Sequence, residues 1–348
     1  MSAAGTRREA RERAVELLYE AETKSVHPLE VVAALPIRPD AYAVDLAAGV
    51  ADHRLEIDHV LGRYAARWPV SRMAAMDRAV LRLGVLELAV MLDVPTGVCL
   101  SEAVELGGRY GSADETPKFV NGILARVAEE VRDDGARPWR PIDVVVFDMD
   151  GVIRHWTGGA MREFEEAHGL EPGTVGAAAF SSPIYDDAMR GRLTAEEWAA
   201  AIGERIAEDH PGVDVDACAT MWLATEWRVD EEVVGIARAL QAAGQRIAVF
   251  SNASTRLEQD MSSMGVGELF HHVANSSAMG KAKPDVDAFE HVAADLGVAP
   301  ERLLFVDDRD ENVLGALDAG WHAVQMRDAA GLGDVLRRLG VPGAPDAA

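Results

Sequence analysis

The sequence predicts two domains of different class, an all-α helical bundle followed by an α/β domain with a Rossmann-like parallel sheet and an inserted helical cap. The chain has 348 residues, more than one ordinary domain holds. Apolar residues recur with a helical period as far as residue 132, and short apolar runs with helical patterns between them follow residue 141. Charge also divides the chain. Residues 1–140 carry 18 Lys and Arg against 22 Asp and Glu, and the remainder carries 16 against 36.

The first part, residues 1–132, shows helical patterns and no strand-like alternation. In the range 6–21, Ala10, Ala14, Leu17 and Ala21 recur at three- and four-residue steps and form one apolar face. Further helices are expected at 40–66, 71–92, 98–110 and 118–132. Prolines separate these patterns, and short connections make successive helices neighbours in a bundle.

The segment 133–141 is polar and contains one Gly and two Pro, which is typical of an interdomain linker. The second domain is expected at 142–348, with strands at 142–147, 246–250, 302–306 and 322–326. The first two strands are ~95 residues apart, too far for a single crossover helix. Helical patterns at 161–168, 194–208 and 216–227 fill this gap. We therefore expect an inserted cap at approximately 155–232.

The composition is that of a soluble protein. Two cysteines, Cys99 and Cys218, exclude a disulfide scaffold and fit a reducing cytoplasm. The charged N-terminus does not resemble a signal peptide, and no run approaches the ~18 apolar residues of a membrane span. We expect a cytoplasmic protein with no membrane partner. Because the second part is strongly acidic, a nucleic acid is expected to bind the first.

Two carboxylates end the first expected strand, in VVVFDMDGV. Asp148 and Asp150 precede Gly151 at the carboxyl end of a parallel strand, where open α/β sheets bind ligands. Two residues apart in an extended segment, they lie on one side, so a cation or a shared proton must offset their charge. The alternative is an ordinary strand-to-loop turn.

Three later motifs add groups that the first one lacks. Ser251-Asn252 follows the second strand, Lys281-Ala282-Lys283-Pro284 follows a glycine, and Asp307-Asp308 follows the third strand. Each also has an ordinary structural interpretation, as a helix cap or a solvated loop. Their order along the chain is what gives them joint weight.

With its motifs FDMDG, VFSN, GKAKPD and FVDD, the second part resembles the haloacid dehalogenase (HAD) superfamily over roughly residues 143–338. The resemblance implies that Asp148 is the nucleophile that forms an aspartyl-phosphate and that Asp150 is the general acid and base. It places Ser251 and Asn252 at the phosphate and Lys283 at the charges of the nucleophile and phosphate. Family members that cleave carbon–halogen bonds lack the second Asp, so phosphoryl transfer from a small phosphorylated metabolite is favoured.

The same resemblance implies a Mg²⁺ ion. Asp308 matches the acidic ligand that joins Asp148 and the backbone carbonyl of Asp150, and Asp307 is an outer or alternative ligand. Hard oxygen ligands suit Mg²⁺, and a cation is needed where several carboxylates face a phosphate. Lys281 remains an alternative to Lys283, and Asn312 stands where some relatives carry another Asp.

Substrate choice is expected to depend on the cap. Three arginines could reach a second anionic group, although a solvated helix face is the simpler interpretation; they are Arg162, Arg190 and Arg192. Three tryptophans are expected in the cap core rather than on a stacking surface; they are Trp198, Trp222 and Trp227.

Residues 7–132 resemble the NusB family of transcription antitermination factors, through RREARERAVELLYEAE, HRLEID, MDRAVLRLGVLELAVMLDVP, VCLSEAVELGGRYG and PKFVNGILARVAEEV. The resemblance implies binding of boxA-type ribosomal RNA leader together with NusE in the transcription elongation complex. The expected RNA contacts are Arg7, Arg8, Arg11, Arg13 and Lys118, with Tyr110, Phe119 and Asn121 as further candidates. Intervening glutamates leave a solvated amphipathic helix as the alternative for the arginines.

We therefore predict an RNA-binding antitermination module fused to a Mg²⁺-dependent phosphatase of the HAD type. The alternative is a phosphatase whose helical domain serves only for interaction or oligomerisation.

Overall fold

The computed structural model describes residues 7–65, 68–91, 93–132 and 141–346. It divides into two compact units: one extends to Ile142 and includes Ala330–Val341, and the other comprises Asp143–Ala329 and Pro342–Pro345. All but residue 141 of the expected linker lies outside the described residues. The expected domain limits remain a prediction. Among the described residues, no helix combines the length and the apolar character that crossing a membrane requires.

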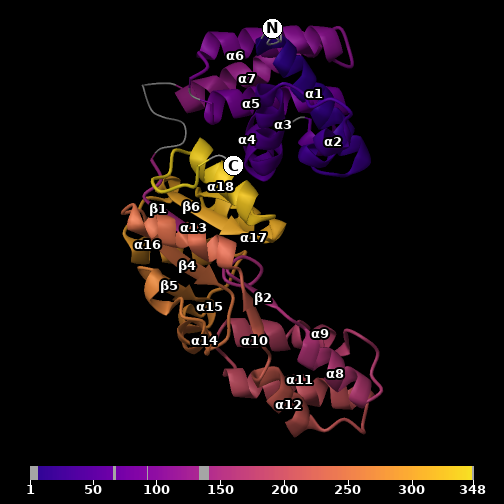
Figure 1. The fold of residues 1–348 in the computed structure, drawn as a ribbon, viewed down its shortest axis with the longest axis vertical. Helices are drawn as coiled ribbons and strands as arrows, with labels where there is room; N and C mark the ends of the chain where they lie inside the picture. Colours follow the sequence, from indigo (N-terminus) through magenta and orange to yellow (C-terminus); the bar gives the residue numbers. More distant parts are fainter. Residues whose placement is uncertain (1–6, 66–67, 92, 133–140, 347–348) are drawn as a thin grey trace. The chain divides into compact units, whose positions relative to one another are not determined.

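The helical unit contains no strand among its described residues, as predicted (Figure 1). Its helices before residue 133 are α1 (Arg7–Lys24), α2 (Pro28–Ala34), α3 (Ala41–Asp52), α4 (Arg54–Tyr64), η1 (Val70–Arg72), α5 (Ala75–Ala89), α6 (Thr96–Tyr110) and α7 (Thr116–Arg132). The range 40–66, expected as one pattern, is two helices that meet at His53. Helix α2 was not expected; a capping box between His27 and Glu30, with Pro28 at the first position, starts it.

Helix α5 lies at the centre of the bundle, because residues on nearly all its faces are buried. It packs against α6 and α7. Gly84 permits the close approach of α7, since a Cβ there would lie 2.4 Å from Leu124 Cδ1. Buried aliphatic side chains from α1, α3, α4 and α7 complete one continuous core. This burial explains why the apolar period in the sequence is so regular.

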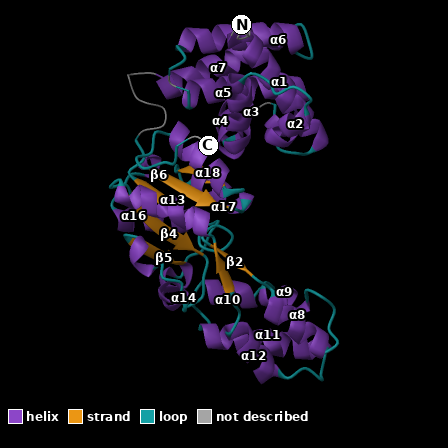
Figure 2. Ribbon diagram, in the orientation of Figure 1, coloured by secondary structure: helices purple, strands orange, loops and turns teal. Residues whose placement is uncertain are grey.

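The second unit contains a five-stranded parallel sheet in the order β5-β4-β1-β6-β7 (Figure 2). The strands are β1 (Val144–Phe147), β4 (Arg246–Ser251), β5 (His272–Asn275), β6 (Leu303–Asp307) and β7 (His322–Gln325). The four expected strands are present, and β5 is additional. The central strands β1, β4 and β6 are almost entirely buried, which agrees with their unbroken apolar sequences.

Helices connect the strands of this sheet. They are α13 (Glu231–Ala242), α14 (Leu257–Ser263), η3 (Gly267–Leu269), α15 (Ser276–Met279), α16 (Val286–Leu296), η4 (Pro300–Arg302) and α17 (Asp310–Asp318). The last helix, α18 (Ala329–Arg338), belongs almost wholly to the helical unit. Its Arg338 pairs there with Asp52, Nη1 to Oδ2 at 2.8 Å, and with Asp45, Nη2 to Oδ1 at 3.1 Å.

The predicted helical cap is inserted between β1 and β4. Its helices are α8 (Gly159–Ala167), α9 (Thr174–Ala179), α10 (Ile184–Met189), α11 (Ala195–Asp209) and α12 (Val215–Leu223). Two short antiparallel strands, β2 (Arg154–Trp156) and β3 (Trp227–Val229), connect it to the sheet domain. The helix expected at 216–227 was predicted to extend too far. Helix α12 ends at Leu223, and Trp227 pairs with Trp156 across the two strands.

Candidate functional site

The carboxyl end of β1 places Asp148 at the centre of a buried cluster of charges. Its backbone N–H donates to the carbonyl of Val306 at 2.8 Å, which fixes the residue beside β6. The residue is only 5% exposed. Burial raises the pKa of the Asp148 carboxyl well above its usual range, and the nearby Lys283 opposes this shift. A carboxylate held here is poorly solvated and therefore reactive.

Lys283 neutralises part of this cluster. Its Nζ lies 2.8 Å from Asp148 Oδ1 and 2.7 Å from Asp307 Oδ2, and it is itself 4% exposed. Burial alone would lower the pKa of Lys283, but the charges of Asp148 and Asp307 raise it. Lys281 is instead partly exposed and pairs with Asp287. Of the two candidate lysines, therefore, only Lys283 reaches the carboxylates.

Oxygen ligands for a cation converge at the same point. Carboxylate oxygens of Asp148, Asp307 and Asp308 all lie within 4.8 Å of one another. Both carboxylate oxygens of Asp307 already accept hydrogen bonds. Its Oδ1 accepts from the backbone N–H of Arg309 at 2.9 Å, and its Oδ2 accepts from Lys283. Asp308 Oδ1 is buried without a hydrogen-bond partner. Two effects raise the pKa of the Asp308 carboxyl: the larger is burial, and the smaller is the negative charge of Asp307.

Gly151 lets Asp308 approach the loop after β1. It adopts a φ of +92°, and a Cβ there would lie 2.4 Å from Asp308 Oδ2. Asn312, in α17, donates to both oxygens of Asp307 at 3.1 and 3.0 Å. Asn312 therefore orients Asp307, and the cluster of three acids against one lysine keeps an excess of negative charge. The donor set fits a hard divalent cation such as Mg²⁺.

Asp150 is held by an arginine. Arg154 Nε donates to Asp150 Oδ1 at 2.6 Å, and Arg154 Nη2 donates to Oδ2 at 3.3 Å. Arg154 is 3% exposed, pairs also with Asp260 at 3.0 Å, and lies over the ring of Trp227 at 3.6 Å. These contacts fix the direction of the Asp150 carboxylate.

The end of β4 supplies a hydroxyl and an amide. Ser251 Oγ is buried and has no hydrogen-bond partner among the described residues. The Asn252 side chain makes two hydrogen bonds to the backbone of Lys283. Its Oδ1 accepts from the Lys283 N–H, and its Nδ2 donates to the Lys283 carbonyl, both at 2.8 Å. Asn252 thus clamps the loop that carries Lys283, and the Ser251 hydroxyl remains available for a ligand.

A cavity of about 570 Å³ opens onto this cluster. On the sheet side it is lined by Asp148, Asp150, Asn252, Lys283 and Asp308. On the cap side its aromatic lining is Trp156, Phe180, Tyr185, Trp198, Trp222 and Trp227. Its size lies in the usual range for a small-molecule site.

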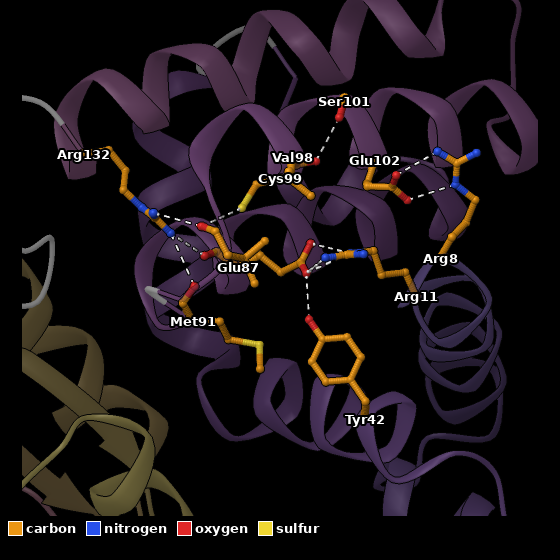
Figure 3. A network of polar contacts seen from close by, with 11 residues as sticks. Arg8, Arg11, Tyr42, Glu87, Met91, Val98, Cys99, Ser101, Glu102 and Arg132 are labelled. Atoms are coloured by element: carbon orange, nitrogen blue, oxygen red, sulfur yellow. Dashed lines mark hydrogen bonds and ion pairs between the residues drawn. The ribbon is translucent and has the colours of Figure 1, made fainter. Parts of the chain in front are cut away.

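The helical unit contains a buried ion pair of a different kind (Figure 3). Arg11 Nη2 lies 2.7 Å from Glu87 Oε1, and Arg11 Nε donates to Oε1 and Oε2 at 2.8 and 3.1 Å. Tyr42 donates its hydroxyl to Glu87 Oε1 at 3.2 Å. Arg132 donates to the carbonyls of Glu87 and Leu88 at the end of α5, both at 2.8 Å. Arg11 is 4% exposed, so its guanidinium is directed into the bundle.

The other basic candidates of this unit lie at its surface. Arg8 pairs with Glu102 at 2.8 Å and with Glu105 at 2.6 Å, and Arg13 pairs with Glu16 at 2.8 Å. Arg7 lies over the ring of Tyr42 at 3.9 Å. Lys118 pairs with Glu115 at 3.1 Å, with 82% of its side chain exposed. The structure therefore leaves four of the five expected RNA contacts accessible and buries Arg11.

Known proteins resemble the two parts of the chain separately. The NusB family matches residues 8–129, and the family of haloacid dehalogenase-like hydrolases matches residues 142–320. The transcription antitermination protein NusB of Kineococcus radiotolerans is 48% identical over 127 residues, which are 35% of this chain and 93% of that protein. The NusB of Acidothermus cellulolyticus is 43% identical over 125 residues, 35% of this chain and 86% of that protein. The chain belongs to both families.

A solved structure also resembles the hydrolase domain. A predicted HAD-like family hydrolase from Porphyromonas gingivalis is 23% identical, with a TM-score of 0.43; the match covers 53% of this chain and 90% of that one.

In the hydrolase domain, the structure brings the predicted motifs together at one edge of the sheet. Asp148, Asp150, Asn252, Lys283 and Asp308 line one cavity, and the neighbouring Ser251 and Asp307 are buried and are not part of its lining. The cap arginines do not line it: Arg190 pairs with Asp285, and Arg192 pairs with Asp187.

Three residues of this site were not found from the sequence. Arg154 holds Asp150, and Tyr185 and Arg309 line the cavity. Arg154 follows Asp150 by four residues, a spacing that carries no signal in a strand-to-loop segment. Tyr185 is on α10, far from every motif in sequence.

Proposed function

We propose that the hydrolase domain is a Mg²⁺-dependent phosphatase that hydrolyses a small phosphomonoester through an aspartyl-phosphate on Asp148. The observation that carries this proposal is the pair of acids after β1, of which Asp148 contacts Lys283 at 2.8 Å. A second Asp at position 150 provides a proton-transfer group that dehalogenation does not need.

The residues of the cluster have distinct roles in this reaction. Asp148 attacks phosphorus with a carboxylate oxygen, and the bond to the leaving oxygen breaks. Asp150 gives that oxygen a proton and then takes one from the water that attacks the phosphoenzyme. Because Arg154 holds Asp150 at 2.6 Å, this contact must loosen while the proton moves. Lys283 and the hydroxyl of Ser251 offset charge that develops on the phosphoryl oxygens.

Asp148, Asp308 and the backbone carbonyl of Asp150 would hold the Mg²⁺ ion. Asp308 has a buried oxygen without a partner, whereas Asp307 is satisfied by Lys283 and Asn312 and serves as an outer ligand. Bound Mg²⁺ would supply positive charge to the phosphate and reduce repulsion from the carboxylates.

Hydrolysis of a generic phosphomonoester tests this function in the full chain. We expect Mg²⁺-dependent release of phosphate, loss of turnover on Asp148→Asn, and a smaller loss on Ser251→Ala. Acid-quenched protein should carry acyl-phosphate, and Asp148→Asn should carry none. Unchanged turnover in Asp148→Asn would remove the mechanism.

For the NusB domain, we propose binding of boxA-type ribosomal RNA leader with NusE in the transcription elongation complex, in support of antitermination. The proposal is supported by similarity to antitermination proteins and by the exposure of Arg7, Arg8, Arg13 and Lys118. Arg11 was proposed as a fifth contact, but its buried pair with Glu87 disfavours that role in this conformation.

RNA binding to the full chain should weaken as salt rises, with a slope near 0.7 per phosphate contacted. Charge reversal at Arg7, Arg8 and Arg13 should abolish binding while helical content is retained. A reversed variant that binds as well as the parent would favour the alternative, a phosphatase with a helical interaction module. The glutamates paired with Arg8 and Arg13 are the observation that favours this alternative.

A further inference from the structure

The cap side of the active-site cavity is lined by aromatic side chains rather than by groups that bind sugar hydroxyls. We propose that the cavity takes a phosphomonoester whose leaving group carries a flat aromatic ring, an inference that rests on the phosphatase function proposed above. The phosphate would lie at Asp148 and Lys283, and the ring would lie against the cap.

The aromatic lining is continuous. Ring centroids of Trp156 and Trp227 are 3.8 Å apart, and those of Trp156 and Trp222 are 5.2 Å apart. The ring centroids of Trp222 and Trp198 are 5.1 Å apart. Those of Trp198 and Tyr185 are 6.4 Å apart, and those of Tyr185 and Phe180 are 5.6 Å apart. These residues come from β2, β3, α10, α11, α12 and the residue after α9, so the fold gathers them from separate segments.

Several of these rings are only partly buried, although Trp156 and Tyr185 pack against the cap core. Trp198 and Trp222 are each 6% exposed and belong to that core, as the sequence suggested. Phe180, in contrast, is 55% exposed, and Trp156, Tyr185 and Trp227 are only partly buried. Leaving a large aromatic ring in water forfeits hydrophobic stabilisation. Four incompletely buried rings around one cavity therefore indicate a surface that an apolar ligand covers.

The arginines that line the cavity do not provide a strong site for a second anion, because each is already engaged. Arg154 is engaged by Asp150 and Asp260, and Arg309 is paired with Glu311. Arg256 donates to the carbonyl of Leu223 at 3.0 Å. The remaining wall includes Met189 and Leu223, which are apolar. Its polar residues His155 and Thr225 are already engaged, His155 by Asp230 at 3.1 Å and Thr225 by the carbonyl of Met221 at 3.3 Å. A polyhydroxylated leaving group would lose water contacts here without equivalent replacements.

Tyr185 connects the aromatic wall to the phosphate end. It lines the cavity together with Asn252, the residue that clamps the Lys283 loop, and its ring contacts Phe180 and Trp198. The cavity volume of about 570 Å³ exceeds what a phosphate alone needs. The geometry thus joins a phosphoryl site and an aromatic site within one cavity.

Benzyl phosphate and cyclohexylmethyl phosphate test this inference, because they differ in aromaticity and have similar size. With the full chain and Mg²⁺, we expect a KM about fivefold lower for benzyl phosphate, equivalent to ~1 kcal/mol, since an aromatic contact contributes beyond area burial. The KM for glycerol phosphate should be higher than the KM for either of these esters. Benzylphosphonate, which is not hydrolysed, should quench tryptophan fluorescence and compete with benzyl phosphate.

Phe180→Leu supplies the matched variant, because Phe180 is exposed and its replacement should not unfold the cap. It should raise KM for benzyl phosphate by about threefold and reduce the preference over cyclohexylmethyl phosphate. Leu314→Ala, at an exposed apolar residue outside the cavity lining, should change neither.

The possible failures are distinct. Hydrolysis of both esters with KM values within twofold overturns the aromatic class and leaves the phosphatase intact. Binding of benzylphosphonate without hydrolysis of any ester overturns the phosphatase and retains the aromatic site. Absence of both binding and hydrolysis overturns both.

Discussion

The two units each bury a cluster of charged side chains, and the clusters differ in how their polar atoms are satisfied. In the NusB domain, Glu87 accepts from Arg11 and Tyr42 within the bundle. In the hydrolase domain, Asp308 Oδ1 and Ser251 Oγ are buried with no hydrogen-bond partner. A buried polar atom without a partner costs free energy. The first cluster is therefore complete in itself, whereas the second leaves polar atoms available to a ligand.

This difference separates a structural ion pair from a functional site more reliably than residue type does. Both clusters contain acids beside a cation, at 2.7 Å in Arg11–Glu87 and 2.8 Å in Lys283–Asp148. The second cluster opens onto a cavity of about 570 Å³. We therefore expect substitutions in the Arg11–Glu87 cluster to affect mainly stability, and substitutions of the acids in the hydrolase cluster to affect mainly ligand binding.

The largest effect on stability is expected from Arg11→Met. This change leaves Glu87 charged and buried with only the hydroxyl of Tyr42, and loss of one partner of a buried pair costs ~3–5 kcal/mol. Urea unfolding of the full chain, followed by circular dichroism, should show a lower midpoint for the helical unit. Arg8→Met, which breaks an exposed pair, is the control and should leave the midpoint nearly unchanged. Equal midpoints for both variants would contradict a structural role for Arg11.

Mg²⁺ should stabilise the hydrolase domain by completing its cluster. A ligand that binds only the folded state adds ~2.7 kcal/mol at 100 times its Kd. Differential scanning calorimetry should show a rise in the melting temperature of this domain with Mg²⁺ and a reversal with EDTA. Asp308→Asn should lose most of this rise. A full rise in Asp308→Asn would show that Mg²⁺ binds elsewhere.

Asp52 provides a pH test of a satisfied pair within the helical unit. Burial would raise its pKa, but the neighbouring His27, whose Nε2 lies 3.7 Å from Asp52 Oδ1, and the charge of Arg338 lower the pKa of Asp52 to about 2. Because the folded-state pKa is below the unfolded value, the stabilisation is present above pH ~4 and is lost as the pH falls toward 2.

Asp52→Asn should therefore cost about 2 kcal/mol at pH 6, and this difference should shrink as the pH falls from 4 toward 2. Chemical unfolding at a series of pH values measures it. Asp45→Asn, at the more exposed partner of Arg338, is the control and should cost less. A difference that does not depend on pH would exclude a charge effect.

The sequence predicted those parts of the fold that have a regular pattern. Strands β1, β4 and β6 are buried apolar runs and were expected, whereas β5 begins with a histidine and ends with an asparagine in only four residues. The three-residue connection between α1 and α2 ends in the capping residue His27, a signal that apolar periodicity does not detect. Trp227 continued a helical pattern in sequence but pairs with Trp156 in a strand, because tertiary pairing overrides local preference.

The site was predictable where residues follow strands directly. Asp148, Ser251 and Asp307 stand at strand ends, so topology alone brings them to one edge. Arg154 and the aromatic wall depend on how the cap folds over that edge, and no local pattern encodes this. Burial of Arg11 was equally hidden, because α1 carries arginines on several faces and only packing selects which one meets Glu87.

The smallest change in stability is expected from Asp148→Asn, and it distinguishes the two clusters most directly. Burial disfavours the charged form of Asp148. In the Asp148→Asn variant, Lys283 would keep its second partner, Asp307, at 2.7 Å. Neutralising Asp148 therefore removes a buried acid without leaving a cation unpaired. In EDTA at pH 7.5, the free energy of unfolding of the hydrolase domain should be unchanged or higher, while turnover is lost.

Lys283→Met is the contrasting variant, because it leaves Asp148 and Asp307 buried without their cation and should lower stability strongly. Both variants can be compared by urea unfolding monitored through tryptophan fluorescence. If Asp148→Asn destabilises the domain as much as Lys283→Met does, then Asp148 belongs to a structural ion pair like that of Arg11 and Glu87. If it does not, the carboxylate is held at a cost to folding, as expected for a group that is placed for reaction rather than for stability.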